Sequence, residues 1–436
     1  MICIYGIILT IFYSLFAFMG YRDIFSPRVI FNLFAWVKNV PYFVQIGDYY
    51  SEELQLMYFS MCFLSMIMVN IGMTAYEKLK NRNMEYVYYN DDISERKIAR
   101  YYHFGIIVFT VGFLINLYVV LQSGGLYFVL SHLQARGEIL RGFGYATTFS
   151  KYMLVLSVIL VEYYMFNKKN AKSKFVFCII FAFSVFSLIV FGARKPALML
   201  LILTIMVYHY CYKRIKWKNI ITFKFLGLSS IVLLFMLMMP MLRYKDNSEI
   251  FMSPIVWLEM AANKFLDIFR EFSYLTGVMF TYQHFNIDNY WFGRVYLNIL
   301  YQWIPSSIFP NKPPMDDGMY LYNMMRGFSI NPNMARIELF FQTSVPFTQE
   351  GALYANFGIP GIIIGGFIIG IFYKHIYRVM RDSRMYLFNI FVYQIIIFEF
   401  VPSVLHSLSP MIGISFAFIF FKVFLHMKYR KSKVVS

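Results

Sequence analysis

The chain has 436 residues, of which 59% are hydrophobic and only 14% are charged, and its mean hydropathy is +0.56. This composition excludes an ordinary soluble domain, because long uncharged runs recur along most of the length. The formal net charge of +17 would fit a nucleic-acid-binding protein, but Lys and Arg gather in alternate loops between apolar runs. We therefore predict an all-α polytopic membrane protein that binds the lipid bilayer and no nucleic acid.

A membrane span needs about 20 mainly apolar residues, and runs of roughly this length predict about 11 transmembrane helices. We place them at 2–19, 29–45, 55–75, 104–121, 147–166, 175–191, 197–212, 225–241, 351–373, 385–401 and 412–427. The predicted organisation is a bundle of about eight helices at 1–241, a large loop at 242–350, and about three helices with a basic tail at 351–436.

The distribution of basic residues predicts the orientation of the chain. With the C-terminal tail in the cytoplasm, the inner segments hold 25 of the 40 Lys and Arg, whereas the four short outer loops hold four. The inner segments are 20–28, 76–103, 167–174, 213–224, 374–384 and 428–436. The positive-inside rule then places the N-terminus and the large loop outside. The first helix lacks a basic leader and a cleavage motif, so we expect a retained span.

The large loop contains elements that suit the membrane surface. Ser253 can cap a helix that starts at Pro254 and carries an apolar stripe, which predicts an amphipathic interfacial helix. The stretch 291–310 is apolar and aromatic but contains Pro305 and Pro310, so we expect an interfacial or re-entrant element there. In the following span, two overlapping pairs of small residues predict close helix packing: Gly361, Gly365, Gly366 and Gly370.

Arginine is unusually common on the predicted outer face, which has eight Arg and four Lys, whereas the inner loops have ten Arg and fifteen Lys. The guanidinium fork binds phosphate oxygens bidentately, so this bias points to an anionic ligand. Pairing with the ten Asp and Glu of the large loop is an alternative for each residue. The outer arginines are Arg136, Arg141, Arg194, Arg243, Arg270, Arg294, Arg326 and Arg336.

The segment from Phe191 to Pro196 is the most specific local signal. It predicts a very tight connection between two apolar helices at the outer membrane surface, with Arg194 and Lys195 at a depth where charge is costly without a partner. Gly192 would allow a lipid head group to approach the backbone. Snorkelling to lipid phosphates is the alternative explanation.

Other ionisable residues are weaker candidates. Lys38 and Glu399 lie within predicted spans, where a functional role and a structural ion pair are both plausible. The outer-side histidines His132, His284 and His406 are more often structural than basic catalysts. Asp316 and Asp317 follow a Pro-rich turn, and we interpret them as part of a solvated loop. Two adjacent carboxylates form an incomplete metal site, and we expect no metal or other cofactor. The cysteines lie in or beside spans, which predicts no disulfide framework.

With these residues in view, the chain resembles the Wzy-type O-antigen polymerases. The similar segments are the turn Gly192–Pro196, the run Ile304-Pro305 followed by Phe309-Pro310-Asn311-Lys312-Pro313, and the run from Glu350 to Gly358 before a glycine-rich span. The span count and basic cytoplasmic tail are also similar. Ser306 stands where the family pattern has Arg after Ile-Pro. The resemblance implies a GT-C-like membrane glycosyltransferase architecture, which O-antigen ligases share.

The resemblance implies a multi-pass protein of the bacterial inner membrane that polymerises undecaprenyl-pyrophosphate-linked oligosaccharides. Expected partners are a chain-length regulator and a flippase. The alternatives are an O-antigen ligase and a polysaccharide flippase or transporter, although we find no internal repeat typical of a transporter. We expect Arg194, Glu350 and His406 in catalysis. The residues expected to bind pyrophosphate are Arg136, Arg141, Arg194, Lys195, Arg243, Arg270 and Arg294.

Overall fold

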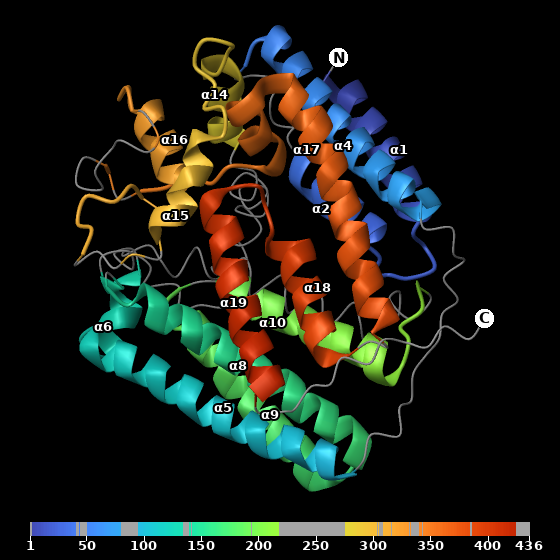
Figure 1. The fold of residues 1–436 in the computed structure, drawn as a ribbon, viewed down its shortest axis with the longest axis vertical. Helices are drawn as coiled ribbons and strands as arrows, with labels where there is room; N and C mark the ends of the chain where they lie inside the picture. The colour runs from blue at the N-terminus through green and yellow to red at the C-terminus, as the bar shows by residue number, and fades with distance from the viewer. Residues whose placement is uncertain are drawn as a thin grey trace, which may run out of the picture. The chain divides into compact units, whose positions relative to one another are not determined.

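A computed structural model provides the fold. The residues that it describes are 2–40, 43, 50–79, 95–133, 139–140, 142–192, 194–217, 275–302, 304, 308–314, 316–330, 332, 340–341, 343–383 and 386–423. Across these ranges every regular element is helical, which confirms the all-α expectation (Figure 1). Each long helix contains an extended apolar stretch, and a helix satisfies its own backbone hydrogen bonds, as a lipid environment requires.

Seven described helices are long and apolar enough to cross a membrane. They are α4 (Glu52–Leu79), α5 (Glu95–Gln122), α8 (Gly144–Lys168), α9 (Ala171–Ile189), α10 (Arg194–Val207) continued by the π-helix η2 (Tyr208–Tyr212), α17 (Gln349–Asp382) and α19 (Val404–Val423). Each of them matches one of the predicted spans. The chain is therefore a multi-pass membrane protein.

Three further predicted spans correspond to shorter helices. Helices α1 (Ile2–Phe18) and α18 (Leu387–Glu399) are apolar but short, and α2 (Pro27–Asn39) has only 13 residues. At 1.5 Å per residue α2 is about 20 Å long, less than the roughly 30 Å of a bilayer core. Helix α2 thus begins two residues before the predicted span 29–45 and is too short to cross alone, and residues 41–42 and 44–45 of that span lie outside the described residues. The expected span at 225–241 and the amphipathic helix that starts at Ser253 lie outside the described residues.

The chain forms two compact units, and each is built from separate stretches of sequence. Unit 1 comprises Met1–Met84, Leu266–Arg378 and Ile395–Pro410, and unit 2 comprises Glu85–Phe265, Val379–Gln394 and Met411–Ser436. This division differs from the predicted boundaries after residues 241 and 350. The described part of the large loop, from residue 275 onward, thus belongs to the same unit as the first helices.

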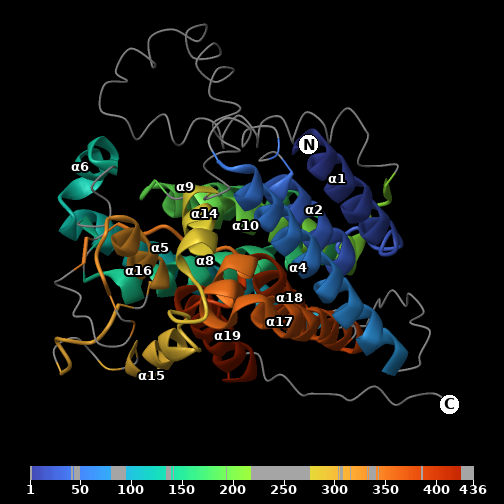
Figure 2. The same cartoon turned by 90° about the horizontal axis from the view of Figure 1, so that it is seen from above.

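In unit 1, α1, α2 and α4 lie side by side (Figure 2). Helix α4 also packs against α17 through glycines. A Cβ atom at Gly370 would collide with the backbone at Val69, and one at Gly72 would collide with the backbone at Phe367. The predicted close approach of the glycine-rich span is therefore confirmed, because two backbones meet where a side chain would hold them apart.

We expect Gly370→Leu to destabilise unit 1, since the leucine would meet the rigid α4 backbone instead of a movable side chain. Overpacking typically costs about 1–3 kcal/mol, and a backbone contact lies at the upper end of that range. Thermal unfolding of detergent-purified protein measures the effect. Gly144→Leu is the matched control, because no heavy atom lies within 4 Å of a Cβ at Gly144. Equal melting of both variants would contradict the packing argument.

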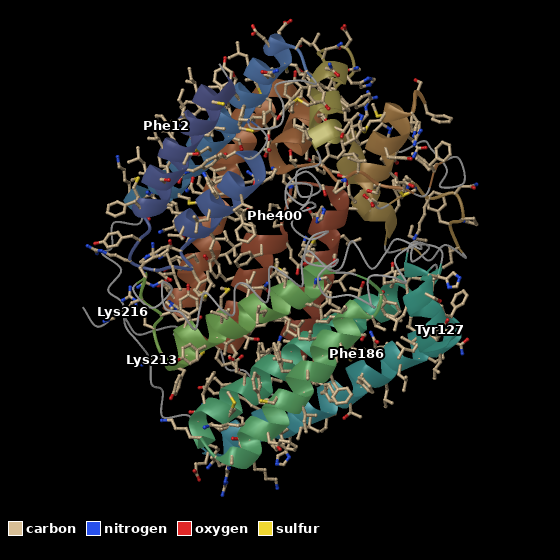
Figure 3. The ribbon with its side chains drawn as sticks, turned by 180° about the vertical axis from the view of Figure 1, so that it is seen from behind. Phe12, Tyr127, Phe186, Lys213, Lys216 and Phe400 are labelled. Carbon is tan, nitrogen blue, oxygen red and sulfur yellow. The ribbon has the colours of Figure 1, made fainter. Side chains whose placement is uncertain are left out.

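Unit 2 is built around the antiparallel neighbours α5, α8 and α9. The Ser150 hydroxyl on α8 donates to the Gly112 carbonyl on α5 at 2.8 Å, and Gly105 meets Val161 on α8. Large aromatic side chains such as Tyr127 and Phe186 stay exposed on this unit (Figure 3). Phe186 lies on the long apolar helix α9, and exposed rings on such a helix are typical of a surface that contacts lipid.

Candidate functional site

The short helices of the large loop pack within unit 1 and form the framework of the candidate site. They are α14 (Leu275–His284), the 3-10 helix η4 (Arg294–Leu297), α15 (Asn298–Gln302) and α16 (Asp317–Met325), drawn in yellow to orange in Figure 1. None of them is long enough to span a membrane. The described part of 291–310 contains only the short helices η4 and α15, and its interfacial or re-entrant placement stays a prediction.

A cleft of about 510 Å³ opens among these loop elements, and we call it the loop cleft. Its lining includes His284, Asp288, Tyr290, Phe292, Arg294 and Phe328. Phe292 is 57% exposed and Phe328 is 47% exposed, so both rings present much of their surface to solvent. The loop cleft thus combines aromatic rings with both signs of charge. Burial lowers the pKa of His284, which favours its neutral imidazole.

The backbone beside the loop cleft is held in an unusual conformation. Phe292 has φ 47° and Gly293 has φ 77°. A bulky residue rarely adopts this left-handed backbone conformation. The N–H groups of Trp291 and Phe292 donate to the carbonyls of Ala355 and Asn356 at 3.0 and 2.9 Å. These bonds hold the strained residue in place, and strain of this kind clusters at ligand sites.

The run from Glu350 to Gly358 forms the support beneath the loop cleft. Asn356 Oδ1 accepts from the Gly293 N–H at 3.2 Å, and its Nδ2 lies 3.4 Å from the Tyr296 hydroxyl. Gly358 has φ 63° and interrupts α17, and a Cβ there would collide with the Tyr290 ring. This motif therefore positions the aromatic segment 290–293 directly.

Polar residues of η4, α16, α17 and the segment before α19 form a group that we call the polar layer: Tyr296, Asp317, Asn356 and Ser403. Tyr296 is half-buried, and the other three are buried. The Tyr296 hydroxyl donates to the Pro402 carbonyl at 2.9 Å. Asp317 Oδ2 accepts from the Val404 N–H at 3.2 Å. These bonds join the loop to the start of α19.

Asp317 is only 4% exposed, although Asp316 and Asp317 were expected in a solvated loop. That interpretation is wrong, because Asp316 caps α16 by accepting from the Gly318 N–H at 3.0 Å, and Asp317 starts the helix facing inward. Burial, followed by the charge of Asp316, raises the pKa of Asp317 to about 7. A carboxyl group with this pKa can both accept and donate a proton near neutrality.

A lysine links the two ends of the Pro-rich segment 304–313. Lys312 Nζ donates to the Ile304 carbonyl at 2.9 Å, and the Lys312 side chain is buried. Burial lowers its pKa. The two halves of the Ile-Pro and Phe-Pro-Asn-Lys-Pro pattern thus meet in space, with the lysine ammonium as the link.

Lys38 forms an ion pair with Glu350, with Nζ and Oε1 2.7 Å apart. The Glu350 side chain is 5% exposed and that of Lys38 is 27% exposed. The next residue, Asn39, donates from Nδ2 to the Tyr13 hydroxyl at 2.9 Å. The second intramembrane candidate, Glu399, is not the partner of Lys38. A structural ion pair was one of the two alternatives for Lys38, and the observed partner comes from the predicted catalytic set.

Three of the predicted site residues that the structure describes lie in unit 1. Arg294 lines the loop cleft, and His406 follows the polar layer on α19, where its backbone N–H donates to Ser403 Oγ at 3.3 Å. Glu350 lies at the start of α17, in the same unit.

Other predicted residues lie in unit 2 or are not described. Gly192 has φ 71° between the end of α9 at Ile189 and the start of α10 at Arg194, so the predicted tight connection is confirmed. Lys195 is exposed. The predicted pyrophosphate residues that lie outside the described part of the chain are Arg136, Arg141, Arg243 and Arg270.

Sequence reasoning missed the importance of Asp317, Asn356 and Phe292. Asp316 before the apolar run of α16 is a recognisable N-cap signal, and it would have indicated an ordered helix there. Asn356 and Phe292 carry no such signal, because their roles depend on a contact between segments 63 residues apart.

No family model matches this chain, and comparison with curated proteins and with solved structures finds no match to it.

Proposed function

We propose that the protein polymerises undecaprenyl-pyrophosphate-linked oligosaccharide repeat units at the outer face of a bacterial inner membrane. The polymer would be an O-antigen or a capsular-type polysaccharide. The large loop and the N-terminus face outside in this proposal, and the basic tail faces the cytoplasm.

The observation that supports this proposal best is that two of the resembling motifs lie in unit 1, and that one of them holds the backbone of the loop cleft. Lys312 closes the Pro-rich motif onto Ile304, and Asn356 of the Glu350–Gly358 motif holds the backbone of the loop cleft. The loop cleft is lined by Arg294, and the same unit contains Asp317, a carboxyl group with a pKa of about 7.

The proposed reaction uses a donor that is already activated. The acceptor hydroxyl oxygen forms a bond to the anomeric carbon of the donor sugar, and the bond from that carbon to the diphosphate oxygen breaks. The electron pair leaves with undecaprenyl pyrophosphate, and the hydroxyl proton passes to a base. Arginines can stabilise the departing negative charge, and we assign this role to Arg194, with Arg243 and Arg270 next.

Three residues of unit 1 are candidates for the proton acceptor. Glu350 and His406 were expected from the sequence, and the structure adds Asp317. Glu350 is engaged by Lys38, whereas Asp317 has a pKa of about 7, which suits a base that works near neutral pH. Because Asp317 is 4% exposed and does not line the loop cleft, we place it beside Glu350 and His406 as a third candidate.

Deletion of the protein should leave cells with surface glycans that carry at most one repeat unit. Single units would still be assembled, but they would not be joined, so the glycan ladder would collapse on a gel. Restoration of the ladder by the gene in trans is the control. Long polymer accumulating on the undecaprenyl carrier would favour the ligase alternative, and an unchanged ladder would exclude both polymerase and ligase.

A further inference from the structure

We propose that the loop cleft binds the sugar rings of an oligosaccharide and not the diphosphate. The proposal rests on the proposed function for the source of the oligosaccharide. It moves Arg294 from the predicted pyrophosphate set to the recognition of the glycan.

The first argument is the aromatic surface. Phe292 and Phe328 are about half exposed in the loop cleft, with Tyr290 beside them. One face of a pyranose ring carries C–H groups with partial positive charge, and the face of an aromatic ring is negative. Stacking on these rings therefore suits a sugar, whereas a phenyl ring has no hydrogen-bond donor or positive charge that would bind a diphosphate.

The second argument is charge. Asp288 lines the same cleft as Arg294. A diphosphate would be repelled by the carboxylate, because like charges in a shared site disfavour one another. Sugar hydroxyls both donate and accept hydrogen bonds, so a carboxylate and a guanidinium can hold neighbouring hydroxyls together.

The third argument is the strain at Phe292. Two backbone hydrogen bonds to α17 hold a phenylalanine at φ 47°, and its ring remains 57% exposed. A folded chain gains little by fixing an exposed ring in an unfavourable conformation. The arrangement is accounted for if the ring is preorganised for a ligand, because preorganisation lowers the entropy cost of binding.

Calorimetric titration of the purified full-length protein in nanodiscs tests this inference. The probes are the repeat-unit oligosaccharide, released by mild acid from the lipid-linked pool of the producing strain, and inorganic pyrophosphate. We expect the wild type to bind the oligosaccharide. Phe292→Ala and Phe328→Ala should each raise the Kd for the oligosaccharide by about 2- to 10-fold, the range for loss of one aromatic pair. Asp288→Asn should also weaken binding.

Two controls separate loss of contact from loss of fold. Phe292→Tyr keeps a ring at the strained position and should retain binding. Ile287→Ala removes an exposed apolar side chain that is 77% exposed and does not line the loop cleft, and it should bind as the wild type does. Thermal melting of each variant checks that it is folded.

Three outcomes would overturn the inference: no binding of the oligosaccharide at millimolar concentration, an unchanged Kd in both phenylalanine variants, or displacement of the oligosaccharide from the cleft by pyrophosphate. The deletion experiment tests the proposed function independently of the binding experiment. An unchanged glycan ladder together with Phe292-dependent binding would remove the polymerase proposal and keep the glycan site, whereas a collapsed ladder with unchanged binding would do the reverse.

Discussion

Lys38→Met should destabilise the protein by about 3–5 kcal/mol, the usual cost of removing one partner from a buried ion pair. The reason is the environment of Glu350, whose side chain is 5% exposed and would keep its negative charge without a counterion. Glu350→Gln should cost less, because the Lys38 side chain is 27% exposed and its ammonium can turn towards water or lipid phosphate. The double variant with both changes should recover much of the loss. Thermal unfolding in detergent measures all three.

The matched control is the pair Lys168–Glu95, in which Glu95 is 85% exposed. Lys168→Met should leave stability unchanged, since exposed ion pairs contribute little. The same variants also separate structure from catalysis. If Glu350 only neutralises Lys38, the double variant should make polymer, whereas a catalytic Glu350 predicts a folded double variant without polymer. Equal destabilisation by the double and single variants would contradict the ion-pair argument.

Arg194→Lys should lower the rate of polymer formation 100- to 1,000-fold, the range for loss of one donor that stabilises transition-state charge. Lysine keeps the positive charge but loses the bidentate fork. The position supports this role, because Gly192 at φ 71° turns the chain sharply and α10 begins at Arg194. Arg194→Ala should be at least as severe, with little change in membrane abundance.

Polymer ladders beside immunoblots of membrane fractions measure this effect. Lys172→Ala is the control, because Lys172 is exposed in the predicted cytoplasmic segment 167–174 and should not alter the ladder. A residue that only snorkels to lipid would tolerate lysine. Near-normal polymer from Arg194→Ala at normal abundance would therefore exclude the assignment and move it to Arg243 and Arg270.

Hydropathy alone predicted the seven described helices that are long enough to cross a membrane, and the spacing of small residues predicted the close packing at Gly370. Both signals are local, because each depends on residues within about 20 positions of one helix. Helix ends were less predictable. The run at 29–45 contains enough apolar residues for a span, yet α2 ends at Asn39, where polar side chains are buried against neighbouring helices.

The site was predicted in its residue types more than in its arrangement. Arg294, Glu350 and His406 all belong to unit 1, but nothing local to Glu350 indicates that its partner is Lys38, 312 residues away. Asp317 was assigned to a solvated loop, since two adjacent carboxylates after a Pro-rich turn are usually hydrated. Burial against Val404, from a distant helix, changed both its exposure and its pKa.

By itself the sequence determined that this protein crosses a membrane on helices and turns tightly at Gly192, because apolar length and glycine freedom act within a short stretch of chain. Only the tertiary structure decided that Glu350 meets Lys38, that Asp317 is buried, and that Phe292 is held beside a cleft. These features depend on contacts between segments that are far apart in the chain. Buried polar groups need hydrogen-bond or ion-pair partners, and the packing of the fold decides which residues these are. The spacing of residues along the chain does not indicate them.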